Sequence, residues 1–217
     1  MAIQVLVIGL GQFGISLVRS LASVNAEVIA VDRSKDKVRL AADLAASVSC
    51  IDATDESELA ALAPDRRDIC ICAIGDEARE SSIICTALLR QLGAKRLIAR
   101  ATDPLHERIL RLIGAHEVIN PENIVGERIA KRLMYAGLRE EQLGDDLVFS
   151  DVTTPPALVG HTLASLEIPR RHDLTVGAIR RGEELLMPGG GTRLEQGDRL
   201  ILLGRPGRVS AMLEKLA

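Results

Sequence analysis

The sequence predicts an α/β fold, in which a doubly wound parallel sheet is followed by a small α+β domain. Across residues 1–123, short apolar runs rich in Val and Ile alternate with amphipathic segments. This alternation is typical of a parallel sheet covered by helices. A long amphipathic segment at residues 124–137 then breaks the pattern. From residue 147 onward, strand-like runs are separated by Gly-containing turns, which predicts a second and smaller unit.

The elements of the parallel sheet follow from the apolar runs and from the residues that end them. The strands are expected at residues 3–8, 27–31, 46–51, 69–74, 96–100 and 116–119. The intervening helices are expected at residues 12–24, 34–45, 55–63, 77–92 and 103–113. Ser34 and Thr54 are the expected N-caps of two helices, and Gly93 and Gly114 are expected to close two others. Ligands of such a sheet bind beyond the carboxyl ends of its strands.

The second half of the chain begins after Asn120-Pro121-Glu122. Residues 124–137 are expected to form one amphipathic helix, and the polar run at 139–146 is expected to be a linker. The predicted domains are therefore 1–123, a helix and linker at 124–146, and 147–217. The smaller domain should contain strands at 147–153, 174–180, 184–187 and 199–204, and a last helix at 206–216.

The turn after the first strand carries the motif G-x-G-x-x-G, formed by Gly9, Gly11 and Gly14. The second expected strand ends on Asp32. Together these features are the fingerprint of a Rossmann-like dinucleotide-binding βαβ unit. Gly9 permits the tight turn, Gly11 lets a pyrophosphate approach the backbone, and Gly14 lets the helix pack on the strand. The helix N-terminus favours phosphate, and Asp32 can accept the ribose hydroxyls.

Composition excludes some functions and locations. The net charge is -3 at pH 7, and aromatic residues make up 1% of the chain, so neither a basic surface nor stacking platforms for nucleic acid are expected. The sequence shows no apolar run long enough for a membrane helix and no signal peptide, which predicts a cytoplasmic protein.

The cysteine and histidine residues do not have the spacing of metal ligands. The four cysteines, Cys50, Cys70, Cys72 and Cys85, are expected to be reduced and to pack in the core. The four histidines, His106, His116, His161 and His172, are scattered along the chain. Structural or surface roles are expected for them.

Motifs along the whole chain resemble those of regulator-of-potassium-conductance (RCK) proteins of the TrkA/KtrA family. In the first domain these are residues 9–14, 31–32, 52–54, 73–75, 114–115 and 121–122. In the second domain they are residues 158–166, 175–182 and 192–200. The resemblance implies a cytosolic, non-enzymatic regulatory subunit of a potassium uptake system. It implies dimers that assemble into an octameric ring and dock on a membrane potassium transporter or channel subunit of the KtrB or TrkH kind.

The resemblance also implies roles for individual residues of this chain. The phosphates would be lined by Gly9, Gly11, Gln12, Phe13 and Gly14. Asp32 would hold the ribose, with Arg33 and Lys37 near the adenosine end. The adenine would be flanked by Asp52, Ala53 and Thr54, and the rim of the fourth strand would be formed by Ala73, Ile74 and Gly75. Arg100 would face phosphate, and Glu122 would help to bind a divalent cation or sodium near the nucleotide. No catalytic residue is implied.

The implied ligand is ATP or ADP, with NAD(H) as the alternative. Gln12 stands where many Ktr relatives have Arg, which weakens recognition of a γ-phosphate and keeps NAD(H) open. Asp32 would repel the 2′-phosphate of NADP. In the C-terminal domain the family can bind cyclic di-AMP. Here Glu167, Pro169 and Thr175 replace the usual Asp, Arg and Asn, and the alternative is an apolar dimer interface.

Two other functions fit a dinucleotide-binding unit. One is an NAD-dependent oxidoreductase, although the small C-terminal domain shows no acid–base pair beside a nicotinamide. The other is an NAD-sensing transcription factor, although no basic helix-turn-helix pattern is visible.

Overall fold

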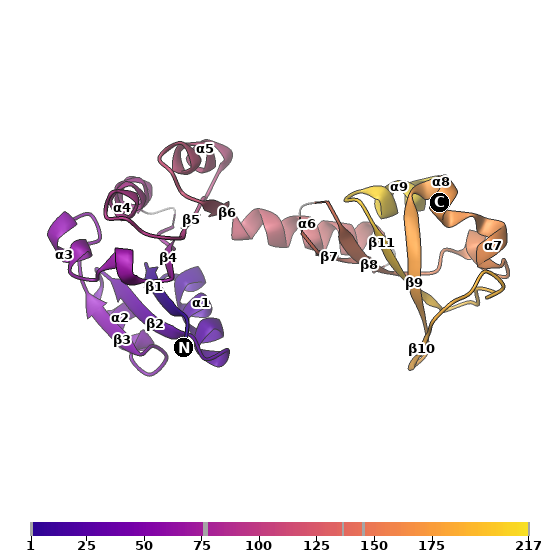
Figure 1. The fold of residues 1–217 in the computed structure, drawn as a ribbon, viewed down its shortest axis with the longest axis horizontal. Helices are drawn as coiled ribbons and strands as arrows, with labels where there is room; N and C mark the ends of the chain where they lie inside the picture. Colours follow the sequence, from indigo (N-terminus) through magenta and orange to yellow (C-terminus); the bar gives the residue numbers. More distant parts are fainter. Residues whose placement is uncertain (1, 76–77, 136, 145, 217) are drawn as a thin grey trace. The chain divides into compact units, whose positions relative to one another are not determined.

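The computed structural model describes residues 2–75, 78–135, 137–144 and 146–216. Its internal contacts divide the chain into two units, Met1–Asn123 and Ile124–Ala217 (Figure 1). The fold class predicted from the sequence is confirmed, because a parallel α/β unit is followed by a smaller unit with an antiparallel sheet.

The first unit is built on a parallel sheet, six-stranded within the described residues, with the strand order β3-β2-β1-β4-β5-β6. Its strands are β1 Gln4–Ile8, β2 Glu27–Asp32, β3 Ser47–Cys50, β4 Ile69–Cys72, β5 Leu97–Arg100 and β6 Glu117–Ile119. The helices between them are α1 Gln12–Ser23, α2 Lys35–Ala41, α3 Glu56–Ala60, α4 Arg79–Gln91 and α5 Pro104–Leu112. The chain order reverses between β1 and β4, and ligands bind at such a switch point in open α/β sheets.

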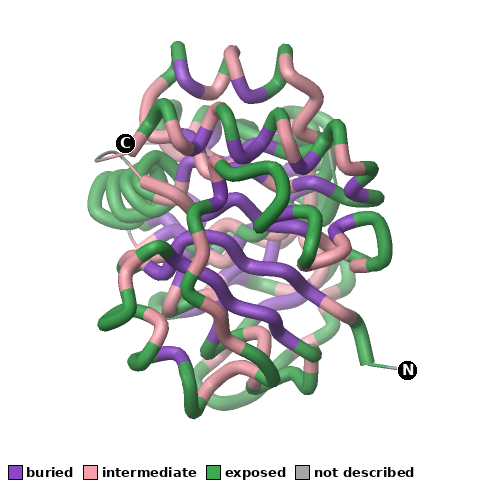
Figure 2. Tube along the Cα trace, turned by 90° about the vertical axis from the view of Figure 1, so that its left-hand side faces the viewer, coloured by how far each residue is buried: buried purple, intermediate pink, exposed green. Residues whose placement is uncertain are grey.

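Apolar side chains cover both faces of this sheet, which explains why its strands are continuous apolar runs. In β1, Leu6 and Ile8 pack with Cys70 and Cys72 of β4 on one face. Val5 and Val7 belong to a second cluster on the other face. Figure 2 shows the buried strands as a continuous purple band. Burial on both faces holds the strand ends, and therefore the loops beyond them, in fixed positions.

Of the two predicted N-caps, Thr54 is wrong and Ser34 is confirmed in position only. Thr54 is not the N-cap of α3, because the carboxylate of Asp55 accepts hydrogen bonds from the backbone N–H groups of Ser57 and Glu58. Ser34 occupies the N-cap position of α2 but makes no side-chain capping bond. The expected start of α4 at residue 77 lies outside the described residues.

Gly93 and Gly114 follow α4 and α5 with φ values of +81° and +99°. They therefore close these helices in the left-handed region, as the sequence predicted. The cysteine prediction is confirmed only in part. All four cysteines are free thiols, and Cys70, Cys72 and Cys85 are buried, but Cys50 is exposed.

Helix α6, Pro121–Met134, crosses the boundary between the two units. It begins at Pro121 rather than at residue 124, because the side chain of Asn120 accepts a hydrogen bond from the backbone N–H of Asn123 at 3.0 Å. An Asn cap followed by proline is a favoured helix start. Glu122 consequently lies in the first turn of α6. No described residue of α6 is buried in this chain.

The second unit contains an antiparallel sheet, five-stranded within the described residues, with the order β10-β9-β11-β8-β7. Its strands are β7 Arg139–Gln142, β8 Val148–Thr153, β9 Leu174–Arg181, β10 Glu184–Leu186 and β11 Arg199–Gly204. Its helices are α7 Leu163–Leu166, α8 Ile168–His172 and α9 Arg208–Leu216. Its core includes Ile179 of β9, Leu200 of β11 and Met212 of α9.

The predicted linker at 139–146 is wrong for Arg139–Gln142, which form strand β7 and pair with β8. This strand was missed because its sequence is wholly polar. A polar edge strand needs no apolar alternation, since only one of its edges is paired and most of its side chains face water. Glu140 is held there by Lys131 of α6, whose Nζ lies 2.7 Å from the carboxylate. Helices α7 and α8 were also missed, because each is too short to show a helical period.

Candidate functional site

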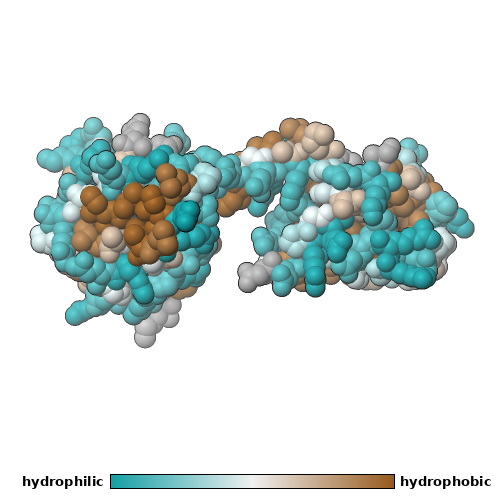
Figure 3. Space-filling view, turned by 90° about the horizontal axis from the view of Figure 1, so that it is seen from above, coloured by the Kyte–Doolittle hydropathy of each residue, from teal (hydrophilic) through white to brown (hydrophobic). Residues whose placement is uncertain are grey.

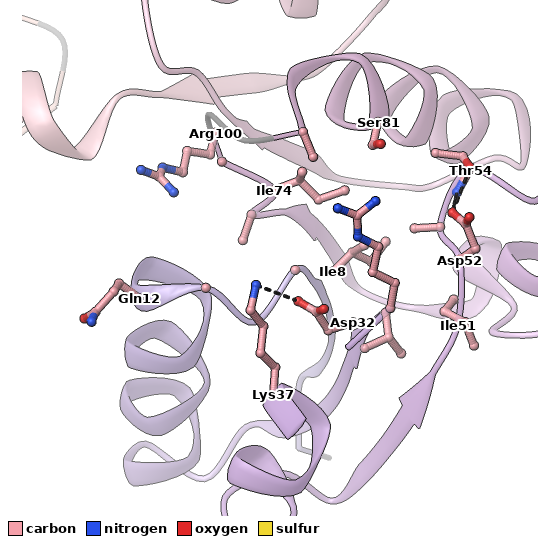
Figure 4. A pocket seen from close by; sticks show the side chains of 18 residues that line it. Ile8, Gln12, Asp32, Lys37, Ile51, Asp52, Thr54, Ile74, Ser81 and Arg100 are labelled. Carbon is pink, nitrogen blue, oxygen red and sulfur yellow. Dashed lines mark hydrogen bonds and ion pairs between the residues drawn. The ribbon is translucent and has the colours of Figure 1, made fainter. Parts of the chain in front are cut away.

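A cavity of about 510 Å³ lies at the carboxyl ends of the strands of the first unit (Figure 4). It is centred where the sheet order reverses, between β1 and β4. Its walls come from the ends of the first five strands and from the start of α4. The lining residues are Ile8, Gly9, Gly11, Gln12, Val31, Asp32, Arg33, Lys37, Ile51, Asp52, Ala53, Thr54, Ala73, Ile74, Gly75, Ala78, Ser81 and Arg100.

The glycines of the β1–α1 turn have different structural tasks. Gly9 has φ +94°, and a Cβ there would lie 2.9 Å from the backbone nitrogen of Ile74. A Cβ on Gly14 would lie 3.0 Å from the carbonyl carbon of Gly9 and closer still to its oxygen. The absence of side chains at Gly9 and Gly14 therefore lets the β1–α1 turn lie close to the backbone that follows β4, and lets α1 pack against the turn. No atom of the described residues lies within 4 Å of a Cβ on Gly11, so Gly11 instead leaves space in the cavity.

Helix α1 begins at the edge of this cavity. Gly11 is its N-cap residue and offers no side chain to the first turn. The first N–H groups of a helix have no partner within the helix, and they carry the positive end of its dipole. Gly11 and Gln12 line the cavity at this point. This end of the cavity is therefore suited to an anionic group such as phosphate.

Asp32 lies in the middle of the cavity wall, at the end of β2, and is only 9% exposed. One carboxylate oxygen accepts the backbone N–H of Leu10 at 2.7 Å, and the other accepts that of Ser34 at 2.8 Å. The Nζ of Lys37 lies 3.9 Å from the first oxygen. These bonds fix the carboxylate, and each oxygen keeps a lone pair for a further donor such as a sugar hydroxyl.

The far end of the cavity is formed by the loop after β3. Asp52 accepts the backbone N–H of Thr54 at 2.9 Å and its hydroxyl at 2.7 Å, which lowers the pKa of Asp52. Figure 4 shows this pair on the side opposite Gln12 and Arg100. Ile51 and Ala53 add apolar wall here. A loop fixed by these hydrogen bonds and lined by apolar side chains can hold a flat base.

Arg100 ends β5 and reaches the α1 end of the cavity. Its guanidinium carbon lies 5.6 Å from the ring centroid of Phe13, which belongs to the first turn of α1. Its Nη2 forms an ion pair with Glu122. A Cβ on Gly75 would lie 2.7 Å from its Nη1, so the glycine makes room for the guanidinium. The cavity thus has a cationic group beside the α1 N-terminus.

Most of the site residues expected from the sequence line this cavity, but three do not. Phe13 supports Arg100, Gly14 packs against Gly9, and Glu122 is paired with Arg100. The residues that sequence reasoning missed are Ile8, Val31, Ile51, Ala78 and Ser81. The first three are the strand-end residues next to the motifs, so the strand boundaries could have indicated them. Ala78 and Ser81 carry no recognisable signal.

The structure pairs Glu122 with an arginine rather than with other metal-ligating groups. Within the described residues, no group of three or more His, Cys, Asp or Glu side chains could hold a metal ion. A cation at Glu122 would therefore need most of its oxygen ligands from the bound molecule. The cation role of Glu122 stays a prediction.

The second unit has its own cavity of about 420 Å³. Its lining includes Pro169, Thr175 and Arg205. Pro169 and Thr175 are two of the three positions at which the sequence departs from the residues expected around cyclic di-AMP, and the third, Glu167, does not line the cavity. Binding of that dinucleotide stays a prediction.

Comparisons with known proteins agree with this description. The family model of the TrkA-N domain matches residues 5–121, and that of the TrkA-C domain matches residues 147–217. The chain is 33% identical over 200 residues to the Ktr system potassium uptake protein C of Bacillus subtilis, covering 91% of this chain and 90% of that protein. It is 31% identical over 215 residues to the Ktr system potassium uptake protein A of Vibrio alginolyticus, covering 98% and 97%.

Among solved structures, the GsuK channel bound to NAD resembles the whole chain with a TM-score of 0.69 at 24% identity. This chain spans 39% of the length of that channel chain, and the likeness at this identity shows the shared fold. Among the described residues of this chain, no helix is both long enough and apolar enough to cross a membrane.

Proposed function

Since the chain belongs to the TrkA/KtrA family of RCK proteins, we propose that it is the cytoplasmic, nucleotide-binding regulatory subunit of a potassium uptake system. Ligand binding to the first unit changes the conformation of an assembly of several copies, and this assembly controls a membrane potassium transporter or channel subunit of the Ktr or Trk type. The observation that carries the proposal is the cavity at the β1/β4 switch point. Its anion-binding end, central carboxylate and apolar far end follow the order phosphate, ribose and base.

The proposed ligand is ADP or ATP. A phosphate chain at the N-terminus of α1 would lie beside Arg100, whose charge favours a terminal phosphate. In NAD(H) the pyrophosphate is followed by an uncharged ribose instead, and the charge of Arg100 stabilises that ribose less than it stabilises a terminal phosphate. NAD(H) stays the alternative, because Asp32 and the glycine turn serve both ligands. A cation held between the phosphates and Glu122 would complete the site when nucleotide is bound.

Apolar surface supports the proposed assembly of dimers into an octameric ring. Helix α6 exposes Val125, Ile129 and Leu133, which are spaced as one face of a helix, and it also exposes Ile124. In the first unit, α4 and α5 expose Ile84, Leu105 and Leu112. Figure 3 shows apolar surface gathered on that unit. Contiguous apolar patches of this kind mark interaction sites, and a second copy of the chain is the partner that we propose.

We assign no catalytic step to the cavity. Its carboxylates accept hydrogen bonds from the backbone, since Asp32 fixes the glycine turn and Asp52 fixes its own loop. The lowered pKa of Asp52 keeps it ionised at neutral pH, far from the value that suits proton transfer. An oxidoreductase would need such a group beside the nicotinamide, and the proposed regulatory role does not.

The ligand proposal predicts the order of affinities in calorimetric titrations of the full chain. ADP and ATP should bind, NADH should bind more weakly, and NADPH should bind at least about tenfold more weakly than NADH because Asp32 faces its 2′-phosphate. Repeating the ATP titration with and without Mg²⁺ tests the cation. Binding of NADH alone would instead favour the alternative, and the absence of binding by all four would refute the proposed site.

A further inference from the structure

Arg100 is the one described residue that both lines the nucleotide cavity and forms an ion pair with α6. We propose that this guanidinium is shared between two competing partners, Glu122 in the first turn of α6 and a phosphate group bound at the N-terminus of α1. Binding of the phosphate would draw Arg100 away from Glu122 and release the first turn of α6. The inference rests on the proposed function, because it requires a phosphate-bearing ligand in the cavity.

The position of the guanidinium supports a role in phosphate binding. It lies over the ring of Phe13, and Phe13 is the second residue of α1. The cation is therefore held beside the helix terminus that favours an anion. Figure 4 shows Arg100 on the same side of the cavity as Gln12, the first residue of α1. A phosphate at this helix end would meet both the N-terminal N–H groups and the guanidinium.

The guanidinium has unused hydrogen-bonding capacity. Its Nε is buried and has no hydrogen-bond partner among the residues that the structure describes, although an arginine side chain carries five N–H donors. The Arg100 side chain is only 14% exposed, so water replaces few of the missing bonds. Within the described parts of the chain, its one ion-pair partner is Glu122, whose side chain is 62% exposed. Among these residues, Arg100 is thus a largely desolvated cation with an incomplete set of acceptors.

A phosphate is the stronger of the two partners. An ion pair with an exposed carboxylate typically changes an equilibrium by less than about fivefold. Phosphate carries more charge and offers several acceptor oxygens to the planar guanidinium, so such charged bonds commonly change an equilibrium by about ten- to a hundredfold. When both partners are present, Arg100 should therefore turn toward the phosphate.

Loss of the Arg100 contact would loosen a defined part of α6. The helix start is held by the Asn120 cap, by Pro121 and by the Glu122 ion pair. The ion pair is the only one of these three that depends on the cavity. Because binding linkage is reciprocal, a change that weakens the hold of Glu122 on Arg100 must also strengthen phosphate binding. The site and α6 are then coupled through a single side chain.

The test is a calorimetric titration of the full chain with ADP in the presence of EDTA, so that a cation role of Glu122 cannot contribute. Glu122→Gln should bind ADP about two- to fivefold more tightly than the wild type, because the competing carboxylate is gone. Arg100→Gln should bind ADP at least about tenfold more weakly. Adding Glu122→Gln to Arg100→Gln should change nothing further, since the competition no longer exists.

Glu117→Gln is the matched control. Glu117, the first residue of β6, forms an ion pair at 3.2 Å with Arg96, which directly precedes β5, and neither residue lines the cavity. The Glu117→Gln variant should bind ADP with the same affinity as the wild type. In parallel, deuterium uptake by residues 121–134 should rise in the wild type when ADP is added, and should already be raised in Glu122→Gln without ADP.

The outcomes separate this inference from the proposed function. If the wild type binds ADP but Glu122→Gln binds it equally or more weakly, the competition does not exist and the inference is overturned alone. The inference is also overturned if Glu122→Gln tightens ADP binding by the same factor in the Arg100→Gln variant as in the wild type. If the wild type binds no nucleotide, the proposed function fails and the inference fails with it.

Discussion

Replacement of Gly14 by alanine is expected to destabilise the first unit by about 3 kcal/mol or more and to abolish nucleotide binding with it. The added Cβ would lie 3.0 Å from the carbonyl carbon of Gly9 and closer to its oxygen. Both are backbone atoms of the β1–α1 turn, so no flexible side chain can move aside. Helix α1 would have to shift away from β1. Urea unfolding of the full chain measures the loss, and ADP titration measures the binding.

Gly11→Ala is the matched control for this effect. In the part of the chain that the structure describes, no atom lies within 4 Å of a Cβ at Gly11, and its φ of -68° is accessible to alanine. The free energy of unfolding should therefore change by no more than about 1 kcal/mol. The methyl group would nevertheless enter the cavity where the phosphates approach, so the affinity for ADP should fall at least about tenfold. Equal stability losses in both variants would contradict the division of roles between the two glycines.

Asp32→Ala is expected to have the second largest effect. The substitution removes the acceptor of two backbone N–H groups, those of Leu10 and Ser34, and Leu10 is buried. An unsatisfied buried donor costs about 1–3 kcal/mol, so the first unit should lose about 2 kcal/mol of stability. The ligand would also lose the acceptor of its ribose hydroxyls. Two such charged bonds predict a fall in ADP affinity of about a hundredfold or more.

Asp36→Ala controls for the loss of a carboxylate in the same region. Asp36 lies in the first turn of α2 and, among the described residues, pairs only with Arg39, and both side chains are exposed. Stability should change by less than about 0.5 kcal/mol, and ADP affinity should not change. If Asp32→Ala bound ADP as tightly as Asp36→Ala, Asp32 would not contact the ribose.

The sequence predicted most of the fold because local and long-range signals agree in this chain. The apolar run at β1 leads into a glycine turn, and that turn leads into α1, so strand, turn and helix each indicate the same βαβ unit. Errors occurred where one signal was missing. Strand β7 is polar because it lies at a sheet edge, and its pairing with β8 cannot be read from Arg139–Gln142 alone.

The candidate site was predictable in its parts and less so in its connections. The glycine turn, Asp32 and the loop at Asp52 are each marked by residue type and position, and the structure places them around one cavity. The cap of α3 was assigned to Thr54 because Thr54 and Asp55 are both good N-caps. The structure distinguishes them, since Thr54 bonds to Asp52. The Arg100–Glu122 pair joins positions in separate elements, and no local sequence pattern predicts it.

Potassium flux through the membrane partner tests the proposed function most directly. The full chain and the Ktr-type membrane subunit of the same organism would be reconstituted together in vesicles, and uptake of rubidium would be followed as a substitute for potassium. Uptake is expected to depend on whether ADP or ATP is present, and this dependence should be lost with Gly11→Ala. Uptake that is the same with and without the chain, or an undiminished nucleotide response with Gly11→Ala, would contradict the proposed function.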